Sequence, residues 1–177
     1  MTPYNPAACF RLQAEDDPIG DLLRQYREKN IDLCFQDITG HIGVPAFKAF
    51  VQAQDGTIIK ATGAGLDARS AILAAMTEVP WPFPNSPSSA PGPRNLPLRK
   101  LRNFPSFDTG SAQGNLCLLE TALLRAGHEI FYVDISRDDI RLPVIRALVT
   151  GLDYMASFDQ LTSLSPRLLA NMLAYTK

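Results

Sequence analysis

The stretch that decides the fold runs from Asp37 to Ala49 and reads DITGHIGVPAFKA, because a similar stretch recurs further along the chain. Asp134-Ile135-Ser136 repeats its first three residues at an offset of 97, and Leu142 to Ala147, LPVIRA, repeats its last six at an offset of 98. One inserted residue explains the difference. Similarity at a fixed spacing indicates a duplicated structural unit, with chance resemblance between short apolar strands as the alternative.

The same order of elements, helix then strand then strand, accompanies both copies. Apolar residues at i, i+3, i+4 and i+7 from Ile19 predict a first helix that Asp17 caps and Pro18 begins. The first copy is predicted to contain a helix over residues 17–30 and strands over 31–38 and 44–54. The second is predicted to contain a helix over 113–126, ended by Gly127, and strands over 129–136 and 143–150.

Three further elements lie between and after the two copies. Asp55-Gly56 predicts a hairpin into a third strand over residues 57–61, Asp67 caps a helix over 68–79, and Ser165-Pro166 opens a last helix through Tyr175. The first three strands are too close in sequence for parallel pairing, so neighbours should be antiparallel. We predict an α+β fold of duplicated helix-strand-strand units, whose strands join one antiparallel or mixed sheet or form a pseudo-symmetric pair.

A proline-rich segment separates the two copies. Seven of the 14 prolines lie between Pro80 and Pro97, and such density excludes a helix or a central strand. We therefore expect residues 80–110 to be a long extended connection, pinned by aromatic anchors at Trp81, Phe83, Phe104 and Phe107. This divides the chain into a first α/β unit at 1–79, the connection at 80–110 and a second α/β unit at 111–177.

The composition of the 177 residues is that of a globular protein, with 46% hydrophobic and 20% charged residues. The net charge of −1 and the shortness of the basic stretch from Arg94 to Arg102 argue against nucleic-acid binding. Cys9, Cys34 and Cys117 lack metal-ligand spacing and are interpreted as reduced core thiols. No apolar run is long enough to span a membrane and no signal peptide precedes the first helix, so we expect a cytoplasmic protein.

No common catalytic motif occurs in the sequence, so we assign no catalytic residue. Gly63-Ala64-Gly65, just before a helix, is either a phosphate-binding turn or, as we favour, a plain strand-to-helix turn. Glu78, at the edge of the helical apolar stripe, is either a Mg²⁺ or phosphate-water ligand or an exposed carboxylate near the helix end.

Three more charged residues are candidates for a site. Glu120 lies among leucines on the second-copy helix and is either a half-buried carboxylate with a partner or a rim residue. Lys48 and Arg146 occupy equivalent strand positions in the two copies, where each is either an anion contact or a charge that protects a sheet edge.

Three segments in order resemble the YcaO family. Asp37 to Ala49 is similar to its acidic strand end and G-[IV]-P-V turn, and Gly63 to Glu78 to its G-x-G followed by the helix A-L-x-R-A-L-T-E. Leu142 to Asp153 is similar to its I-P-V-[VI]-R-x-x-V-P-G-L-E signature. The resemblance spans about residues 17–155 and implies the C-terminal half of a YcaO-like domain.

The resemblance implies a function as well. YcaO proteins use ATP and Mg²⁺ to activate peptide backbone amides, giving azolines by cyclodehydration or, with sulfide-delivering partners, thioamides. It makes Glu78 a residue that binds Mg²⁺ and ATP, and Arg146 a contact for the ATP phosphates. The substrate would be a peptide or protein.

Departures from the family pattern qualify that implication. The family's N-terminal S-x-x-E-x-x-E-R segment has no counterpart, Ala74 and Trp81 stand where the family has Arg and Gln, and Thr150 replaces a proline. We therefore expect a divergent, truncated half-domain that is incomplete or inactive alone and forms a homodimer or binds a partner protein. The alternative is a noncatalytic peptide-binding or scaffold module that completes or regulates a partner.

Overall fold

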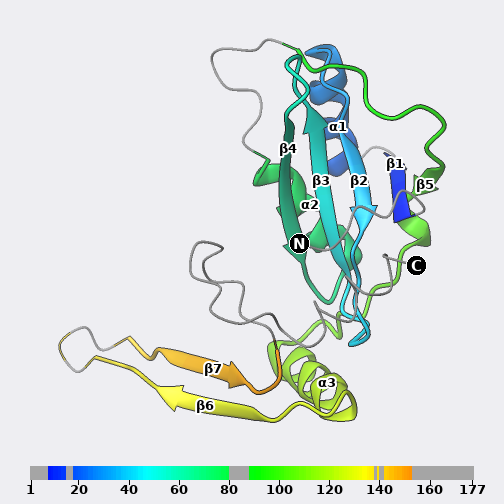
Figure 1. The fold of residues 1–177 in the computed structure, drawn as a ribbon. Helices are drawn as coiled ribbons and strands as arrows, with labels where there is room; N and C mark the ends of the chain where they lie inside the picture. Colours follow the sequence, from blue (N-terminus) through cyan, green and yellow to red (C-terminus); the bar gives the residue numbers. More distant parts are fainter. Residues whose placement is uncertain (1–7, 15–17, 80–87, 138, 140–141, 153–177) are drawn as a thin grey trace, which may run out of the picture. The chain divides into compact units, whose positions relative to one another are not determined.

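The computed structural model describes residues 8–14, 18–79, 88–137, 139 and 142–152. Contacts divide the chain into two compact units, residues 4–119 and a second that holds residues 120–177, and each is described by itself. The elements, seen in Figure 1, are β1 (Cys9–Gln13), α1 (Pro18–Glu28), β2 (Cys34–Asp37), β3 (Ala46–Gln52), β4 (Ile58–Ala64), α2 (Ala68–Thr77), β5 (Leu98–Lys100), a 3₁₀ turn (Leu101–Asn103), α3 (Ala112–Arg125), β6 (Ile130–Asp134) and β7 (Ile145–Val149).

The N-terminal unit is built on a five-stranded sheet with the order β4-β3-β2-β1-β5. β1, β2, β3 and β4 pair antiparallel with their neighbours, whereas β5 pairs parallel with β1. The sheet is therefore mixed, and the predicted α+β class and the antiparallel pairing of successive strands are both confirmed.

Helices α1 and α2 cover one face of this sheet and share its main core. Tyr26 of α1 donates a hydrogen bond from its hydroxyl to the carbonyl oxygen of Met76 in α2, at 3.1 Å. Both helices contribute to one cluster of buried apolar side chains with the sheet residues, whose largest members are Phe10, Ile19, Phe35, Phe47, Val51, Ile72 and Met76. The opposite face carries a smaller buried cluster of Cys9, Cys34 and Phe50, against which Leu96 packs.

The outer strands β1 and β5 differ from the prediction. The sequence predicts no strand before Asp17 and an extended connection over residues 80–110. The structure has β1 in the first of these segments and β5, at residues 98–100, at the sheet edge in the second. β5 begins directly after Pro97, whose carbonyl oxygen accepts the Arg11 N–H at 2.9 Å. The proline rule excluded only central strands, and an edge strand that starts beyond the last proline satisfies it. Phe104 packs on the core as expected, Phe107 is exposed, and Trp81 and Phe83 lie outside the described residues.

The predicted duplication is confirmed by the strand registers. Asp37 pairs with Phe47 across β2–β3, and Asp134 pairs with Ile145 across β6–β7. The rest of each register follows at the same offsets, so every residue of one antiparallel pair has a counterpart in the other. The two pairs lie in separate sheets, because β6 and β7 form a two-stranded sheet of their own in the C-terminal unit.

The turn after the first strand is also built alike in both copies. The Asp37 carboxylate accepts the Thr39 N–H at 3.1 Å, and the Asp134 carboxylate accepts the Ser136 N–H at 2.8 Å. The same Thr39 and Ser136 then accept the backbone N–H of Ala46 at 3.1 Å and of Val144 at 2.8 Å through their hydroxyls. The D-I-[ST] motif is thus a turn in which both side chains replace backbone partners.

The residues that end α1 and α3 also correspond between the two copies. Asn30 after α1 and Gly127 after α3 have positive φ angles of 54° and 83°, the left-handed conformation that ends a helix. One residue later, Ile31 and His128 donate their N–H groups to the carbonyl oxygens of Tyr26 and Leu123, which are 97 residues apart. Chance similarity of short strands does not explain a correspondence that begins inside the preceding helix.

Other sequence predictions fare unevenly. The helices at 17–30, 68–79 and 113–126 and the hairpin at Asp55-Gly56 are present with slightly different bounds, and Gly56 has a φ of 87°.

Cys9 and Cys34 are buried thiols as expected, but Cys117 is exposed, so the prediction that it is a core thiol is wrong. It lies on a face of α3 that the apolar pattern alone did not separate from the buried one. The helix predicted for Ser165–Tyr175 lies outside the described residues. Among the helices that are described, none has the length and apolar character to cross a bilayer.

Candidate functional site

An open cleft of about 310 Å³ lies where the start of α2, the end of β1 and the 3₁₀ turn meet in the N-terminal unit. Its lining includes the apolar side chains of Leu101 and Phe104 and three cations, Arg69, Lys100 and Arg102. The lining contains one carboxylate, Asp67. The arrangement suits an anionic group attached to an apolar or organic body.

The backbone donors at the start of α2 are already used, so the cleft does not offer a helix N-terminus to an anion. Asp67 caps the helix by accepting the N–H groups of Arg69 and Ser70, each at 3.2 Å, through its carboxylate. The Ala68 N–H donates to the Pro105 carbonyl oxygen at 3.3 Å, and the Ala71 N–H to the Asp67 carbonyl oxygen at 3.1 Å. Any anion in the cleft would therefore be held by side chains.

The Gly63-Ala64-Gly65 segment has a packing role. A Cβ atom at Gly63 would lie 2.2 Å from the Ala71 carbonyl oxygen and 2.5 Å from the Ala75 nitrogen, so α2 rests directly on β4 at this residue. The Gly65 N–H donates to the Pro45 carbonyl oxygen at 3.1 Å. The close approach of helix and strand explains the first glycine, as the favoured strand-to-helix interpretation allows.

Glu78 stands at the opposite end of α2 from the cleft. It is the C-cap residue and its side chain is exposed; its backbone N–H donates to the carbonyl oxygens of Ala74 and Met76. A ten-residue helix is about 15 Å long, so Glu78 and the cleft are separate features. The carbonyl groups at a helix C-terminus add partial negative charge beside a carboxylate, which favours a cation there.

Lys48 and Arg146 occupy equivalent positions, as predicted. Lys48 pairs with Gln36 across β2–β3 and Arg146 with Val133 across β6–β7. The Lys48 amine donates to the Gln36 side-chain oxygen at 3.1 Å, and burial, helped by the nearby Lys60 charge, lowers the pKa of Lys48. Arg146 is exposed.

Glu78 lies in the N-terminal unit and Arg146 in the second unit. Glu120 has a hydrogen-bond partner in β6. Tyr132 of β6 donates its hydroxyl to the half-buried Glu120 carboxylate at 2.6 Å, and this hydrogen bond raises the pKa of Tyr132. The first of the two interpretations of Glu120, a carboxylate with a partner, is therefore the one observed. In the parts of the chain that the structure describes, no three His, Cys, Asp or Glu side chains gather as a metal site would require.

Sequence reasoning missed how the proline-rich segment is attached to the sheet. The Arg11 guanidinium pairs with the Asp32 carboxylate, which also accepts the Gly92 N–H at 2.8 Å. The hydrogen bonds from Arg11 lower the pKa of Asp32 despite its partial burial. Burial, with the adjacent Asp32 charge, raises the pKa of the Cys34 thiol to about 11.

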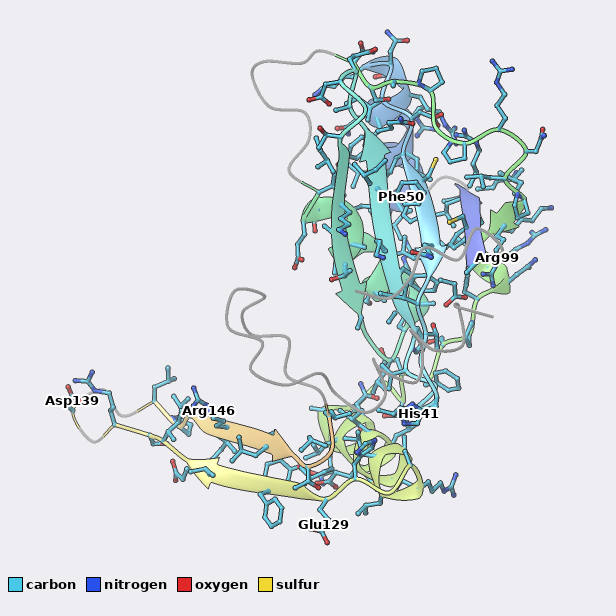
Figure 2. The ribbon with its side chains drawn as sticks, in the orientation of Figure 1. His41, Phe50, Arg99, Glu129, Asp139 and Arg146 are labelled. Carbon is cyan, nitrogen blue, oxygen red and sulfur yellow. The ribbon has the colours of Figure 1, made fainter. Side chains whose placement is uncertain are left out.

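Contacts of the Arg99 side chain hold β5 against the sheet. The Arg99 guanidinium carbon lies 4.9 Å from the Phe10 ring centroid and 4.2 Å from that of Phe104, and its Nη1 lies 3.1 Å from the Asp37 carboxylate. Arg99, labelled in Figure 2, thus joins β5 to the acidic end of β2. A run of basic residues is visible in the sequence, but nothing local indicates that one of them lies over two neighbouring aromatic rings.

Comparison with known proteins places this geometry in a family. The profile of the YcaO cyclodehydratases, described as binding ATP and Mg²⁺, matches residues 2–80. The structure of the heterocyclase TruD is similar to 85% of this chain at 26% identity and a TM-score of 0.62. Residues 2–80 carry part of a YcaO domain. A heterocyclase solved in complex with substrate and cofactor shares the fold over 84% of the chain, at 24% identity and a TM-score of 0.64.

The similarity covers only part of the solved heterocyclases. The chain spans about a quarter of each of these two heterocyclases, 25% and 24% of their lengths. The profile match contains the first copy of the duplicated unit, and the structural similarity extends into the second. A search of curated proteins finds no match.

Proposed function

We propose that this YcaO segment takes part in ATP-dependent activation of peptide backbone amides, by cyclodehydration or thioamidation. The observation that carries the proposal is the agreement of the family profile over residues 2–80 with a heterocyclase-like fold over most of the chain. In this proposal Glu78 binds Mg²⁺ with ATP, and Arg146 contacts the ATP phosphates. No residue of the chain is assigned a catalytic role.

The chemistry of Glu78 fits a metal ion that arrives with its nucleotide. Mg²⁺ is usually held by one or two carboxylates together with substrate phosphates and water, not by a closed protein cage. Glu78 is exposed, and the C-terminal end of α2 adds negative potential around it. Bound Mg²⁺-ATP would supply the phosphoryl group that activates the amide oxygen, and Glu78 would orient it.

One carboxylate and one guanidinium are few charges for a triphosphate and its metal ions. We therefore infer that turnover needs further groups, contributed by a partner polypeptide or a second copy of the chain. The expected behaviour of this chain alone is weak nucleotide binding without ATP hydrolysis.

Thermal unfolding in millimolar ATP and Mg²⁺ tests the proposal. At a free ATP concentration ten times Kd, ligand binding stabilises a protein by about 1.4 kcal/mol, which raises the Tm of a chain of this size by about 3–6 °C. Glu78→Ala should abolish the rise. Glu28→Ala is the matched control, since Glu28 is also an exposed glutamate at the end of a helix and should leave the rise unchanged.

Two results would overturn the assignment. No Tm shift at saturating millimolar Mg²⁺-ATP would exclude nucleotide binding by this chain and leave the noncatalytic module as the better reading. A shift that survives Glu78→Ala but is lost in Arg102→Ala would place the nucleotide in the basic cleft instead.

A further inference from the structure

β6 is a sheet-edge strand made almost entirely of apolar residues. Its sequence from Ile130 to Asp134 is IFYVD, and Phe131, Tyr132 and Val133 have exposed fractions of 51%, 48% and 42%. Proteins usually protect an edge strand from further pairing with prolines, lysines or other charges along it. β6 contains no proline or lysine, and its one charged residue, Asp134, stands at its end. The strand therefore has the composition of one that pairs along both sides.

The hydrogen bonds to β7 show which backbone groups of β6 point to the outer edge. The Ile135 N–H donates to the Val144 carbonyl oxygen at 2.9 Å, and every second residue back from Ile135 bonds to β7 in the same way. Tyr132, three positions from Ile135, therefore points its backbone N–H and C=O groups away from β7. Among the strands that the structure describes, only β7 pairs with β6, as Figure 1 shows.

In the first copy a strand occupies the equivalent edge. β1 pairs antiparallel with β2, where Phe10 lies opposite Phe35, the counterpart of Tyr132, and the two ring centroids are 5.6 Å apart. At the offset of 97, Phe10 corresponds to Phe107. The Phe107 N–H, however, donates to the Leu66 carbonyl oxygen at 2.8 Å. The second copy thus has the edge, while the counterpart of its β1 is bonded to the N-terminal unit.

An acidic side chain marks one end of the edge. The Asp37 carboxylate, at the equivalent place in the first copy, lies 3.1 Å from Nη1 of Arg99. The Asp134 carboxylate accepts the Ser136 N–H at 2.8 Å, and hydrogen bonds from Ser136 lower the pKa of Asp134, so this carboxylate is charged at neutral pH. A basic side chain would complement it as Arg99 complements Asp37.

We propose that the outer edge of β6 binds an extended segment of another polypeptide as an added antiparallel strand. In the register of β1 on β2, an aromatic residue of the bound segment lies opposite Tyr132, and the residue two positions before it lies opposite Asp134. A basic residue is selected there, because opposite charges directly across an antiparallel pair attract. The ligand is a strand with a basic residue two positions before an aromatic one, held by main-chain hydrogen bonds.

The sequence of the chain favours a different polypeptide over a second copy as the bound strand. Ala8 and Pro105 stand two positions before Phe10 and Phe107, so neither β1 nor its counterpart would place a cation opposite Asp134. The site also requires neither nucleotide nor Glu78, so it is separate from the ATP-dependent activity proposed above.

Fluorescence anisotropy tests the proposal with a labelled peptide, Ser-Arg-Thr-Phe-Thr-Leu-Ser, titrated with the full chain in the absence of ATP. We expect saturable binding. Methylation of the amide nitrogen of the peptide's Phe removes the donor to the Tyr132 carbonyl oxygen and should weaken binding at least tenfold. Methylation of the next Thr is the matched control, since that N–H points away from β6, and it should leave the affinity nearly unchanged.

Substitution of the acidic end gives a second measurement. Asp134→Asn should weaken binding of this peptide by about two- to fivefold and leave a peptide with Thr in place of Arg unaffected. The asparagine oxygen can still accept the Ser136 N–H, so the turn is kept. Asp139→Asn is the matched control, because Asp139 is another exposed aspartate between β6 and β7, and it should bind the peptide as the wild type does.

Three results would overturn the proposal. The first is no saturable binding up to several hundred micromolar protein, and the second is equal affinity for the two methylated peptides. The third is a dimer in sedimentation velocity that excludes the peptide, which would mean that a second copy occupies the edge. Glu78→Ala should bind the peptide like the wild type, so failure of nucleotide binding and failure of peptide binding are told apart.

Discussion

Gly63→Ala is the sharpest probe of the fold around α2. The added methyl group would lie 2.2 Å from the Ala71 carbonyl oxygen, 2.5 Å from the Ala75 nitrogen and 2.9 Å from the Ala74 Cβ. Two of these three atoms are backbone, so no side-chain rotation relieves the clash. The helix would have to move away from β4 by about 1 Å along its middle, which disturbs the whole packed interface.

Overpacking of a well-packed core costs about 1–3 kcal/mol and sometimes more, and a clash against backbone belongs at the upper end of that range. With a urea m-value of about 2 kcal/mol/M for a domain of this size, a loss of about 3 kcal/mol lowers the midpoint of unfolding by about 1.5 M. The midpoint can be measured by far-UV circular dichroism of the chain.

Gly65→Ala is the control for Gly63→Ala, because a Cβ atom at Gly65 meets its nearest neighbour at 3.6 Å, an ordinary contact. It should shift the stability by less than about 1 kcal/mol in either direction. A Gly63→Ala protein with an unchanged urea midpoint would refute the close packing of α2 on β4. If its nucleotide affinity fell while its stability held, the phosphate-binding interpretation of the turn would be restored.

Two further predictions concern titratable groups. Asp32→Asn should cost about 1–2 kcal/mol at pH 7, and because hydrogen bonds from Arg11 lower the folded-state pKa of Asp32, this contribution is fully present above about pH 4 and is lost as the pH falls through the folded pKa. The difference between the urea midpoints of variant and wild type should therefore shrink as the pH is lowered below about 4, and a difference that stays constant with falling pH would contradict the ion pair with Arg11. At pH 8, a thiol reagent added to the native protein should modify Cys117 within minutes and leave Cys34 unmodified, because Cys34 is buried and its pKa is about 11. Cys117→Ser is the control. Rapid modification of Cys34 would contradict its burial.

The elements with local signals could be predicted from the sequence. α2 has an Asp67 cap and an apolar stripe within its own ten residues, and the Asp55-Gly56 hairpin depends only on neighbouring residues. The duplicated unit could be found because its turn uses side chains, Asp37 with Thr39 and Asp134 with Ser136, that leave a trace in the sequence.

The features that depend on distant partners could not be predicted. β5 has three residues, and what makes them a strand is the pairing of Leu98 with Arg11 in β1. The cleft brings Arg69 near Lys100 and Arg102, which are unremarkable surface charges until the chain is folded. Of the candidate site residues, Lys48 and Arg146 were correctly placed as equivalents, whereas the roles of Glu78 and Arg146 in nucleotide binding stay predictions.

The parallel pairing of β5 with β1 also has a consequence for how the N-terminal unit assembles. β2, β3 and β4 join through short hairpins, whose closure is fast, but β5 meets β1 only after the chain has closed a loop from residue 11 to residue 98. That edge should be the last to form and, by the same reasoning, the first to exchange its amide hydrogens. Until it docks, the Phe10 ring lacks both Arg99 and Phe104, and β1 is an unpaired sheet edge of the kind that can pair with another chain.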